Sequence, residues 1–185
     1  MPERQTCPEP RRRALPDLWL FSDERNDAGL EDALRRLPPG SGFVFRHYRL
    51  APDERRAHFE ALAAIGRDNG HAMVLAGDCD TARSWGADGA YAAASALGPC
   101  EALLRLASVH NAREIALADR VGADAMFLSP VFPTRSHPGA ECLGKDGFLA
   151  LAATAHAPVI PLGGMTAERA EELGWARWAA IDGLS

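Results

Sequence analysis

Residues 103–129, LLRLASVHNAREIALADRVGADAMFLS, contain one complete strand–helix–strand unit. The segments Leu103–Val109 and Ala125–Ser129 are mostly apolar, as expected for strands that are covered on both faces. Between them, the segment Ala112–Val121 would form a helix with apolar residues along one face and charged residues on the opposite face. An asparagine precedes this helix and a glycine follows it, the residue types favoured at those two positions. The stretch therefore predicts a parallel βαβ unit.

The same alternation runs through the rest of the chain. Strands are predicted at Leu18–Ser22, Gly42–His47, Ala72–Ala76, Asp88–Ala92, Leu103–Val109, Ala125–Ser129, Val159–Leu162 and Arg177–Ile181. Helices are predicted at Gly29–Leu37, Pro52–Asp68, Asp80–Trp85, Ala112–Val121, Gly147–Ala155 and Ala167–Leu173. This order predicts an α/β fold, a (β/α)₈ barrel of the TIM type. An open doubly wound sheet has the same alternation, but no G-x-G-x-x-G follows the first strand, which disfavours a dinucleotide-binding domain.

The chain is short for such a barrel, with 185 residues against the usual length of about 200–250. Between Ala92 and Leu103 there is room for about two helical turns, and the chain stops soon after the last predicted strand. We therefore expect a trimmed barrel with a short fourth helix, no last helix and one exposed seam, which a second subunit of a homodimer would cover. Residues 1–14 are polar and contain prolines, which predicts a disordered leader before a single barrel domain at 15–185.

Composition restricts the partners of the chain. The net charge of −5 disfavours non-specific binding to nucleic acid. No apolar run approaches the roughly 18 residues of a membrane span, and no apolar core follows the basic N-terminus to make a signal peptide. The four cysteines form no C-x-x-C pair and no zinc-finger spacing, so they are interpreted as reduced thiols of a cytoplasmic protein.

Barrel enzymes carry their reactive groups at the carboxyl ends of the strands and in the loops that follow. The loop at 130–144, PVFPTRSHPGAECLG, is much longer than the usual two to six residues. It holds the hydroxyls of Thr134 and Ser136 and the cationic groups of Arg135 and His137, which suit phosphate oxygens. A long structural loop with ordinary turn chemistry is the alternative.

Three further strand ends carry candidate groups. Gly163 and Gly164 follow the seventh strand before a helix that Thr166 would cap, an arrangement that favours a phosphate site. His110 follows the fifth strand, where an imidazole could move a proton near neutral pH or be structural. Asp78 ends the third strand and is a candidate for Mg²⁺ binding or for a helix cap.

Six motifs resemble the thiamine-phosphate synthase and thiazole tautomerase family: SVHN at 108–111, GAD at 122–124, LSPVFPT at 128–134, SHPG at 136–139, LG at 143–144 and PVIPLGGM at 158–165. The resemblance implies a (β/α)₈ barrel. Synthase members couple hydroxymethylpyrimidine diphosphate with thiazole phosphate, using Mg²⁺ and releasing pyrophosphate. Tautomerase members aromatise thiazole phosphate carboxylate, and a histidine after the fifth strand is implicated.

The resemblance also implies roles for single residues. Arg46 corresponds to a pyrophosphate-binding arginine, Asp78 to an Mg²⁺ ligand, and His110 to the tautomerase histidine. Ser108, Thr134 and Ser136 correspond to residues around the pyrimidine and the diphosphate, and Gly163 and Gly164 to the glycines that hold the thiazole phosphate.

The sequence departs from the synthase pattern after strands two to four. Two lysines of that pattern are replaced by Tyr48 and His137, and Tyr91–Ser95 replaces the segment that carries the second metal carboxylate. Because diphosphate departure needs cations around the leaving group, these losses bear on coupling more than on proton transfer. Three hypotheses remain: a coupling enzyme, an aromatising enzyme that uses His110, and a non-catalytic protein that binds thiazole phosphate or thiamine phosphate. An isomerase of another phosphosugar is disfavoured because no paired acid and base is evident.

Overall fold

The computed structural model describes residues 14–135, 139 and 141–184. Eight parallel strands form one sheet in the order β7-β6-β5-β4-β3-β2-β1-β8. Their bounds are β1 Leu18–Phe21, β2 Gly42–Phe45, β3 Ala72–Ala76, β4 Gly89–Ala93, β5 Leu104–Val109, β6 Ala125–Leu128, β7 Val159–Pro161 and β8 Trp178–Ala180. The helices are α1 Leu30–Arg36, α2 Pro52–Asp68, α3 Cys79–Ser84, α4 Ala112–Arg120, α5 Gly144–Ala152 and α6 Ala167–Leu173, with short 3₁₀ turns η1 Asp27–Gly29 and η2 Ala94–Ala96.

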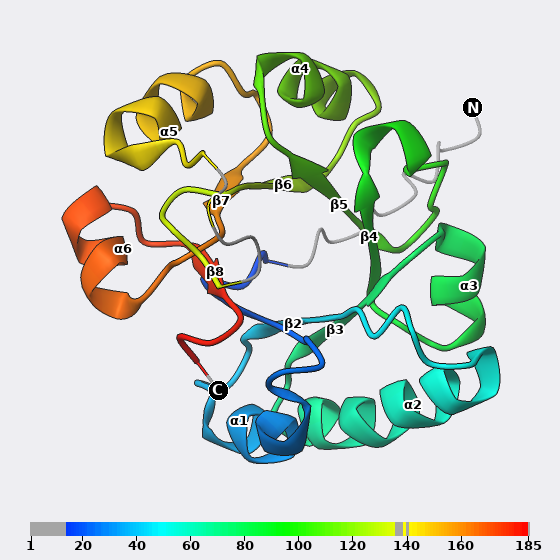
Figure 1. Cartoon of the computed structure of the whole chain (residues 1–185). Coiled ribbons are helices and arrows are strands. Elements are labelled where there is room, and N and C mark those ends of the chain that lie inside the picture. Colours follow the sequence, from blue (N-terminus) through cyan, green and yellow to red (C-terminus); the bar gives the residue numbers. More distant parts are fainter. Residues whose placement is uncertain (1–13, 136–138, 140, 185) are drawn as a thin grey trace, which may run out of the picture.

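The strands curl into a barrel with the helices outside, seen along its axis in Figure 1. Each strand from β1 to β7 pairs in parallel with the next, and β8 returns to pair with β1 through Leu18 opposite Trp178. The hydrogen-bonded ladder is open between β7 and β8. The predicted (β/α)₈ barrel is therefore confirmed, and all eight predicted strands lie where the sequence placed them, to within two residues at each end.

Large aromatic side chains fill the inside of the barrel. Trp19 and Phe21, both fully buried, each meet the ring of Phe127 edge-on, at centroid distances of 5.5 and 4.9 Å. Tyr91 packs edge-on against Phe21 and Phe127 in the same cluster. Two further clusters lie between the strands and the helices. Because the interior is solid with side chains, any site must lie at an end of the barrel.

The barrel is trimmed where the sequence predicted a short fourth helix. The connection from β4 to β5 contains only the single 3₁₀ turn η2. Arg105 ties this connection down, since its guanidinium donates to the carbonyl oxygen of Leu97 at 3.4 Å and to that of Gly122 at 3.1 Å. No helix follows β8 within the part of the chain that the structure describes.

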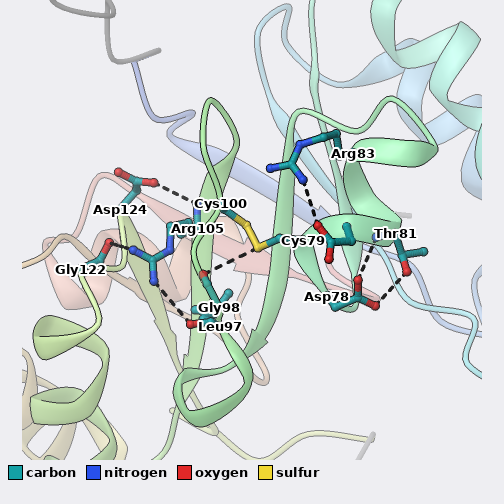
Figure 2. Close-up of a disulfide and its surroundings, with 11 residues drawn as sticks. Asp78, Cys79, Thr81, Arg83, Leu97, Gly98, Cys100, Arg105, Gly122 and Asp124 are labelled. Atoms are coloured by element: carbon teal, nitrogen blue, oxygen red, sulfur yellow. Dashed lines mark hydrogen bonds and ion pairs between the residues drawn. A yellow bond between two sulfur atoms is a disulfide. The ribbon is translucent and has the colours of Figure 1, made fainter.

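A disulfide joins Cys79, in the first turn of α3, to Cys100, in the connection after η2 (Figure 2). The interpretation of all the cysteines as reduced thiols was therefore wrong for this pair. The two residues are 21 positions apart in sequence, so no local motif announces them. The fold brings their Cα atoms to 5.6 Å, within the usual range for a disulfide. Cys142 is a free cysteine.

Helix α5 begins three residues earlier than predicted. The backbone N–H groups of Leu143 and Gly144 donate to the carbonyl oxygens of Pro130 and Val131, at 3.0 and 2.9 Å. The long loop after β6 is thus closed at its base, and the helix starts from that closure. No helix among the described residues has the length and apolar character needed to cross a membrane.

Candidate active site

A cavity of about 510 Å³ opens at the carboxyl ends of the strands. Its walls come from the segments after β2, β5, β6, β7 and β8 and from Tyr91 in β4. The lining residues are Arg46, Tyr91, His110, Ser129, Pro130, Pro133, Thr134, Arg135, Leu162, Gly163, Gly164, Met165, Thr166, Arg169, Ile181, Asp182 and Gly183. Their positions agree with the barrel rule that was used to select candidates from the sequence.

Six of the predicted site residues line this cavity together: Arg46, His110, Thr134, Arg135, Gly163 and Gly164. Ser108 does not line the cavity. Its side chain hydrogen-bonds to the hydroxyl of Tyr91, and Tyr91 does line the cavity. Asp78 lies outside the lining. Ser136 and His137 fall outside the described residues, so their predicted roles stay predictions.

His110 is held by Glu114, one helical turn further along. Oε2 of Glu114 lies 2.8 Å from Nδ1 of His110 and also accepts the backbone N–H of His110 at 2.9 Å. Asn111 caps the same helix, because its side-chain oxygen accepts the N–H of Glu114 at 3.0 Å. With Nδ1 bound to a carboxylate, Nε2 is the ring nitrogen left to act on a ligand. A carboxylate-oriented imidazole on a cavity wall is suited to general acid–base chemistry.

The Glu114 carboxylate is ionised at neutral pH. Burial alone would raise its pKa, but hydrogen bonds from His110 and Asn111, together with the charge of His110, hold the pKa below its usual value. A negative carboxylate at this position stabilises a proton taken up by His110.

Gly163 and Gly164 lie against the loop after β6. Their φ angles are +91° and +64°, a region that other residues rarely adopt. A Cβ atom on Gly164 would lie 2.5 Å from the carbonyl oxygen of Pro133, and one on Gly163 would lie 2.8 Å from the Cα atom of Pro130. The pair is therefore required for packing at the cavity wall, whatever else it binds.

Arg169 extends this wall from the first turn of α6. Its guanidinium donates to the carbonyl oxygen of Gly164 and lies over the ring of Phe132, 4.9 Å from the centroid. Thr166 caps the helix as predicted, accepting the N–H of Arg169 at 3.3 Å. Arg169 and Arg135 are both positive and both line the cavity, which gives it groups that suit an anion.

Arg46 is fixed at the opposite wall by the end of β1. Its Nε donates to the carbonyl oxygen of Ser22 at 2.8 Å and its Nη2 to Asp23 at 2.8 Å. Burial tends to raise the pKa of Asp23, but hydrogen bonds and charge from Arg25, with the charge of Arg46, lower it overall. Arg46 thus faces the cavity as half of an ion pair, which reduces the charge that it offers to a ligand.

Tyr91 brings a phenol to the bottom of the cavity. Burial raises its pKa to about 12, so the hydroxyl stays protonated at neutral pH and can donate or accept a hydrogen bond. Its partner is Ser108 on the neighbouring strand, where Ala93 pairs with Ser108 in the β4–β5 ladder. Ser108 is thus placed beside this phenol, and its predicted role at the substrate stays a prediction.

Asp78 is the N-cap of α3. Its two carboxylate oxygens accept from the backbone N–H and the hydroxyl of Thr81, each at 2.8 Å (Figure 2). Hydrogen bonds from Thr81 also lower the pKa of Asp78. The facing end of β4 carries alanines at 92 and 93. This arrangement does not fit a Mg²⁺ site of two carboxylates, and the ligand role of Asp78 stays a prediction.

Four residues of this region were missed from the sequence. Tyr91 is the third of the five residues of β4, so the barrel rule does not select it, whereas Glu114 is spaced four residues from His110 on a predicted helix and could have been selected. Asp182 directly follows the predicted strand Arg177–Ile181, so the barrel rule could have selected it, whereas Arg169 lies within a helix and carries no such signal.

Comparison with known proteins gives a consistent result. Residues 20–183 match the family described as thiamine monophosphate synthase (TMP-TENI). The thiamine-phosphate synthase of Methanoregula boonei is 32% identical over 85% of this chain and 78% of its own length. That of Pyrococcus furiosus is 25% identical over 84% of this chain and 79% of its own length.

The fold agrees as well. The solved thiamine phosphate pyrophosphorylase from Pyrococcus furiosus superposes with a TM-score of 0.73 over 89% of this chain and 84% of that one, at 22% identity. A native KDPGal structure gives a TM-score of 0.59 at 15% identity, which shows the barrel alone. The sequence match over nearly the whole barrel decides the family: this chain belongs to the thiamine monophosphate synthase family, enzymes of thiamine biosynthesis.

Proposed function

We propose that the cavity binds a phosphorylated thiazole of thiamine biosynthesis and that His110 moves a proton on its ring. The observation that carries this proposal is the 2.8 Å contact between Nδ1 of His110 and Glu114 on the cavity wall. The phosphate would lie against Gly163 and Gly164, within reach of Arg169. A phosphorylated thiazole is the substrate that the coupling and aromatising members of the family share.

Aromatisation is the reaction that this geometry supports best. It is an isomerisation in which a proton leaves a ring carbon and a proton is returned at the exocyclic carbon attached to the ring, so it needs a base and an acid but no oxidant and no second substrate. His110 supplies the base, and the protonated imidazole returns the proton. Glu114 stabilises the protonated ring between the two steps. Tyr91 and Arg46 would bind the polar edge of the substrate.

Coupling to hydroxymethylpyrimidine diphosphate is the second candidate function, and the names of the curated relatives favour it. The leaving pyrophosphate would need cations, and Arg46 and Arg135 are among those that line the cavity. When bound, Mg²⁺ would supply further positive charge to that group. Asp78, as a helix cap, is a poor ligand for it.

The two reactions are separated by assaying the full-length protein with each substrate set. Purified protein is given the non-aromatic thiazole phosphate carboxylate, and the aromatic product is followed by proton NMR. In parallel it is given both coupling substrates with Mg²⁺, and thiamine phosphate is measured. Aromatic product that disappears in His110→Asn supports the proposal, whereas thiamine phosphate formed equally by the wild type and His110→Asn favours coupling.

A matched control is available in His156. It also bonds a carboxylate through Nδ1, that of Asp119 at 3.1 Å, but it is 90% exposed and lies outside the cavity lining. His156→Asn should retain full aromatising activity. Absence of both products, with thiazole phosphate still bound in a calorimetric titration, would overturn the catalytic proposal in favour of a binding protein.

A further inference from the structure

We propose that Asp27, His47 and His58 form a binding site for a divalent transition-metal ion of the zinc class, separate from the cavity described above. The three residues come from different elements: Asp27 from the 3₁₀ turn η1 after β1, His47 from the segment that follows β2, and His58 from α2. None of the three lines the cavity. One ligand atom from each lies within 4.8 Å of the others.

The carboxylate oxygen Oδ1 of Asp27 is the centre of the cluster. It lies 2.9 Å from Nε2 of His47 and 2.7 Å from Nε2 of His58. The two imidazole rings meet edge-on, with centroids 5.0 Å apart. Both histidines thus direct the same ring nitrogen toward one small volume that a carboxylate borders.

His47 provides the strongest evidence for a ligand. Its side chain is only 3% exposed, yet its Nε2 atom makes no hydrogen bond among the described residues. The oxygen of Asp27 lies 2.9 Å from Nε2 as an ion-pair partner, and this contact does not satisfy the hydrogen bond of the ring. A buried polar atom without a hydrogen bond is costly, and a metal ion bound to Nε2 would remove that cost.

The rest of the His47 ring is held as metal-bound histidines are. Its Nδ1 lies 2.9 Å from the hydroxyl oxygen of Ser22, and its ring stacks on Phe45 at a centroid distance of 4.8 Å. A ligand histidine normally donates its other ring N–H to an oxygen, which fixes the tautomer and the ring orientation. Here Nδ1–H would donate to Ser22, which leaves the lone pair of Nε2 for the ion.

Two imidazoles and one carboxylate are the ligands that zinc and its neighbours prefer. In such a site the bonded atoms lie about 2.0–2.2 Å from the ion, so they lie roughly 3–3.5 Å from one another. The Asp27 contacts must therefore open by several tenths of an ångström. Asp27 and His58 are 44% and 31% exposed, which allows that shift and leaves the remaining coordination position to water.

The ion would connect two loops of the active face. The hydroxyl oxygen of Ser22 that lies beside Nδ1 of His47 also accepts the backbone N–H of Arg46 at 2.7 Å. Arg46 lines the cavity, and His47 faces away from it toward Asp27. Metal binding would thus fix the loop after β1 to the segment after β2 and hold Arg46 in place.

The test is a calorimetric titration of Zn²⁺ into full-length protein that has been stripped of metal with a chelator. We expect one Zn²⁺ per chain, and a rise in thermal unfolding temperature on addition of Zn²⁺. His58→Gln, a partly exposed substitution that should fold normally, is expected to weaken binding roughly tenfold or more and to abolish the rise. Asp27→Asn should act in the same direction.

A second readout and a matched control make the test specific. Co²⁺ in place of Zn²⁺ should give visible absorption bands in the wild type that are lost in His58→Gln. His156→Gln removes a histidine that also pairs with a carboxylate but belongs to no metal-binding group among the described residues, and this variant should bind Zn²⁺ like the wild type. No Zn²⁺ binding, or binding that is unchanged in His58→Gln, would overturn the site. Neither result bears on the reaction proposed for His110.

Discussion

Nδ1 of His110 lies 2.8 Å from Oε2 of Glu114, and the same oxygen accepts the backbone N–H of His110. One carboxylate thus fixes both the ring and the chain at the fifth strand end. Because Glu114 acts only through His110, Glu114→Gln should lower kcat by roughly tenfold to a hundredfold, less than the roughly 10²–10⁴-fold that an acid–base group itself contributes. KM should change little, since Glu114 does not line the cavity. Steady-state kinetics of thiazole aromatisation measure both constants.

Glu168→Gln is the control for this substitution. Glu168 lies in the first turn of α6, as Glu114 lies in the first turn of α4, and its side chain hydrogen-bonds with Thr166 instead of a histidine. It should leave kcat unchanged. An increase in KM with unchanged kcat in Glu114→Gln would show that Glu114 acts in binding and not through His110.

The Cys79–Cys100 disulfide should stabilise the region that lacks a fourth helix. Closing a loop of this size contributes about 3 kcal/mol. Reduction by dithiothreitol should therefore lower the free energy of unfolding by about that amount, measured by urea denaturation. The double variant Cys79→Ser, Cys100→Ser should begin at the lower value and not respond to dithiothreitol. Cys142→Ser keeps the disulfide and should behave as the wild type, and a wild type that is insensitive to dithiothreitol would contradict the prediction.

The spacing of apolar residues along the sequence predicted the strands and helices of the barrel well, because it reflects which side chains are buried. The continuous apolar runs became strands covered on both faces, and α2 and α6 have the bounds that the sequence indicated. The predictions failed where a distant contact decides the outcome. Helix α5 starts early because Leu143 and Gly144 bond back to the start of their loop, and the disulfide depends on two segments that meet only in the folded barrel.

In the candidate site, too, some residues could be predicted from the sequence and others depend on contacts between distant segments. His110, Gly163 and Gly164 were found because strand ends converge in a barrel, a rule that needs no coordinates. Glu114 could have been selected from its spacing of four residues from His110, but the role of Arg169 depends on the direction of its side chain, which the sequence does not give. The Asp27, His47 and His58 cluster was missed for a related reason: its members are spread over three elements and have no metal-site spacing along the chain.

Asp119 should make the barrel sensitive to acid. Its carboxylate accepts the backbone N–H groups of His156 and Ala157, at 3.0 and 2.9 Å, and so ties α4 to the segment before β7. Burial raises its pKa, but these bonds and the charge of His156 lower it overall. A carboxylate whose pKa is depressed on folding contributes stability above its unfolded pKa, and this contribution is lost as the pH falls through the folded value.

Asp119→Asn should therefore cost about 1–3 kcal/mol at neutral pH and should lose less stability than the wild type below about pH 4. Urea denaturation at a series of pH values measures both effects. Asp80→Asn is the control, because Asp80 is 94% exposed and forms an ion pair with Arg83 on its own helix. Parallel acid profiles for the wild type and Asp119→Asn would contradict the assignment.

A comparison of Gly164 with Gly144 separates the energetic cost of a left-handed backbone from the cost of close packing. Their φ angles are nearly equal, +64° and +63°. A Cβ atom on Gly144 would meet nothing within 4 Å, but one on Gly164 would lie 2.5 Å from the carbonyl oxygen of Pro133. Gly144→Ala should cost about 1–2 kcal/mol from the left-handed conformation alone. Gly164→Ala should cost a further 1–3 kcal/mol, roughly the cost of overpacking, measured by urea denaturation.

The same pair of variants tests the phosphate end of the cavity. Gly164→Ala would push the loop after β6 away from β7, so calorimetry should show weaker binding of thiazole phosphate, while Gly144→Ala should bind it normally. If both variants lost the same stability and bound thiazole phosphate equally, the close approach at Gly164 would not be what shapes this wall, and its glycine would be explained by backbone conformation alone.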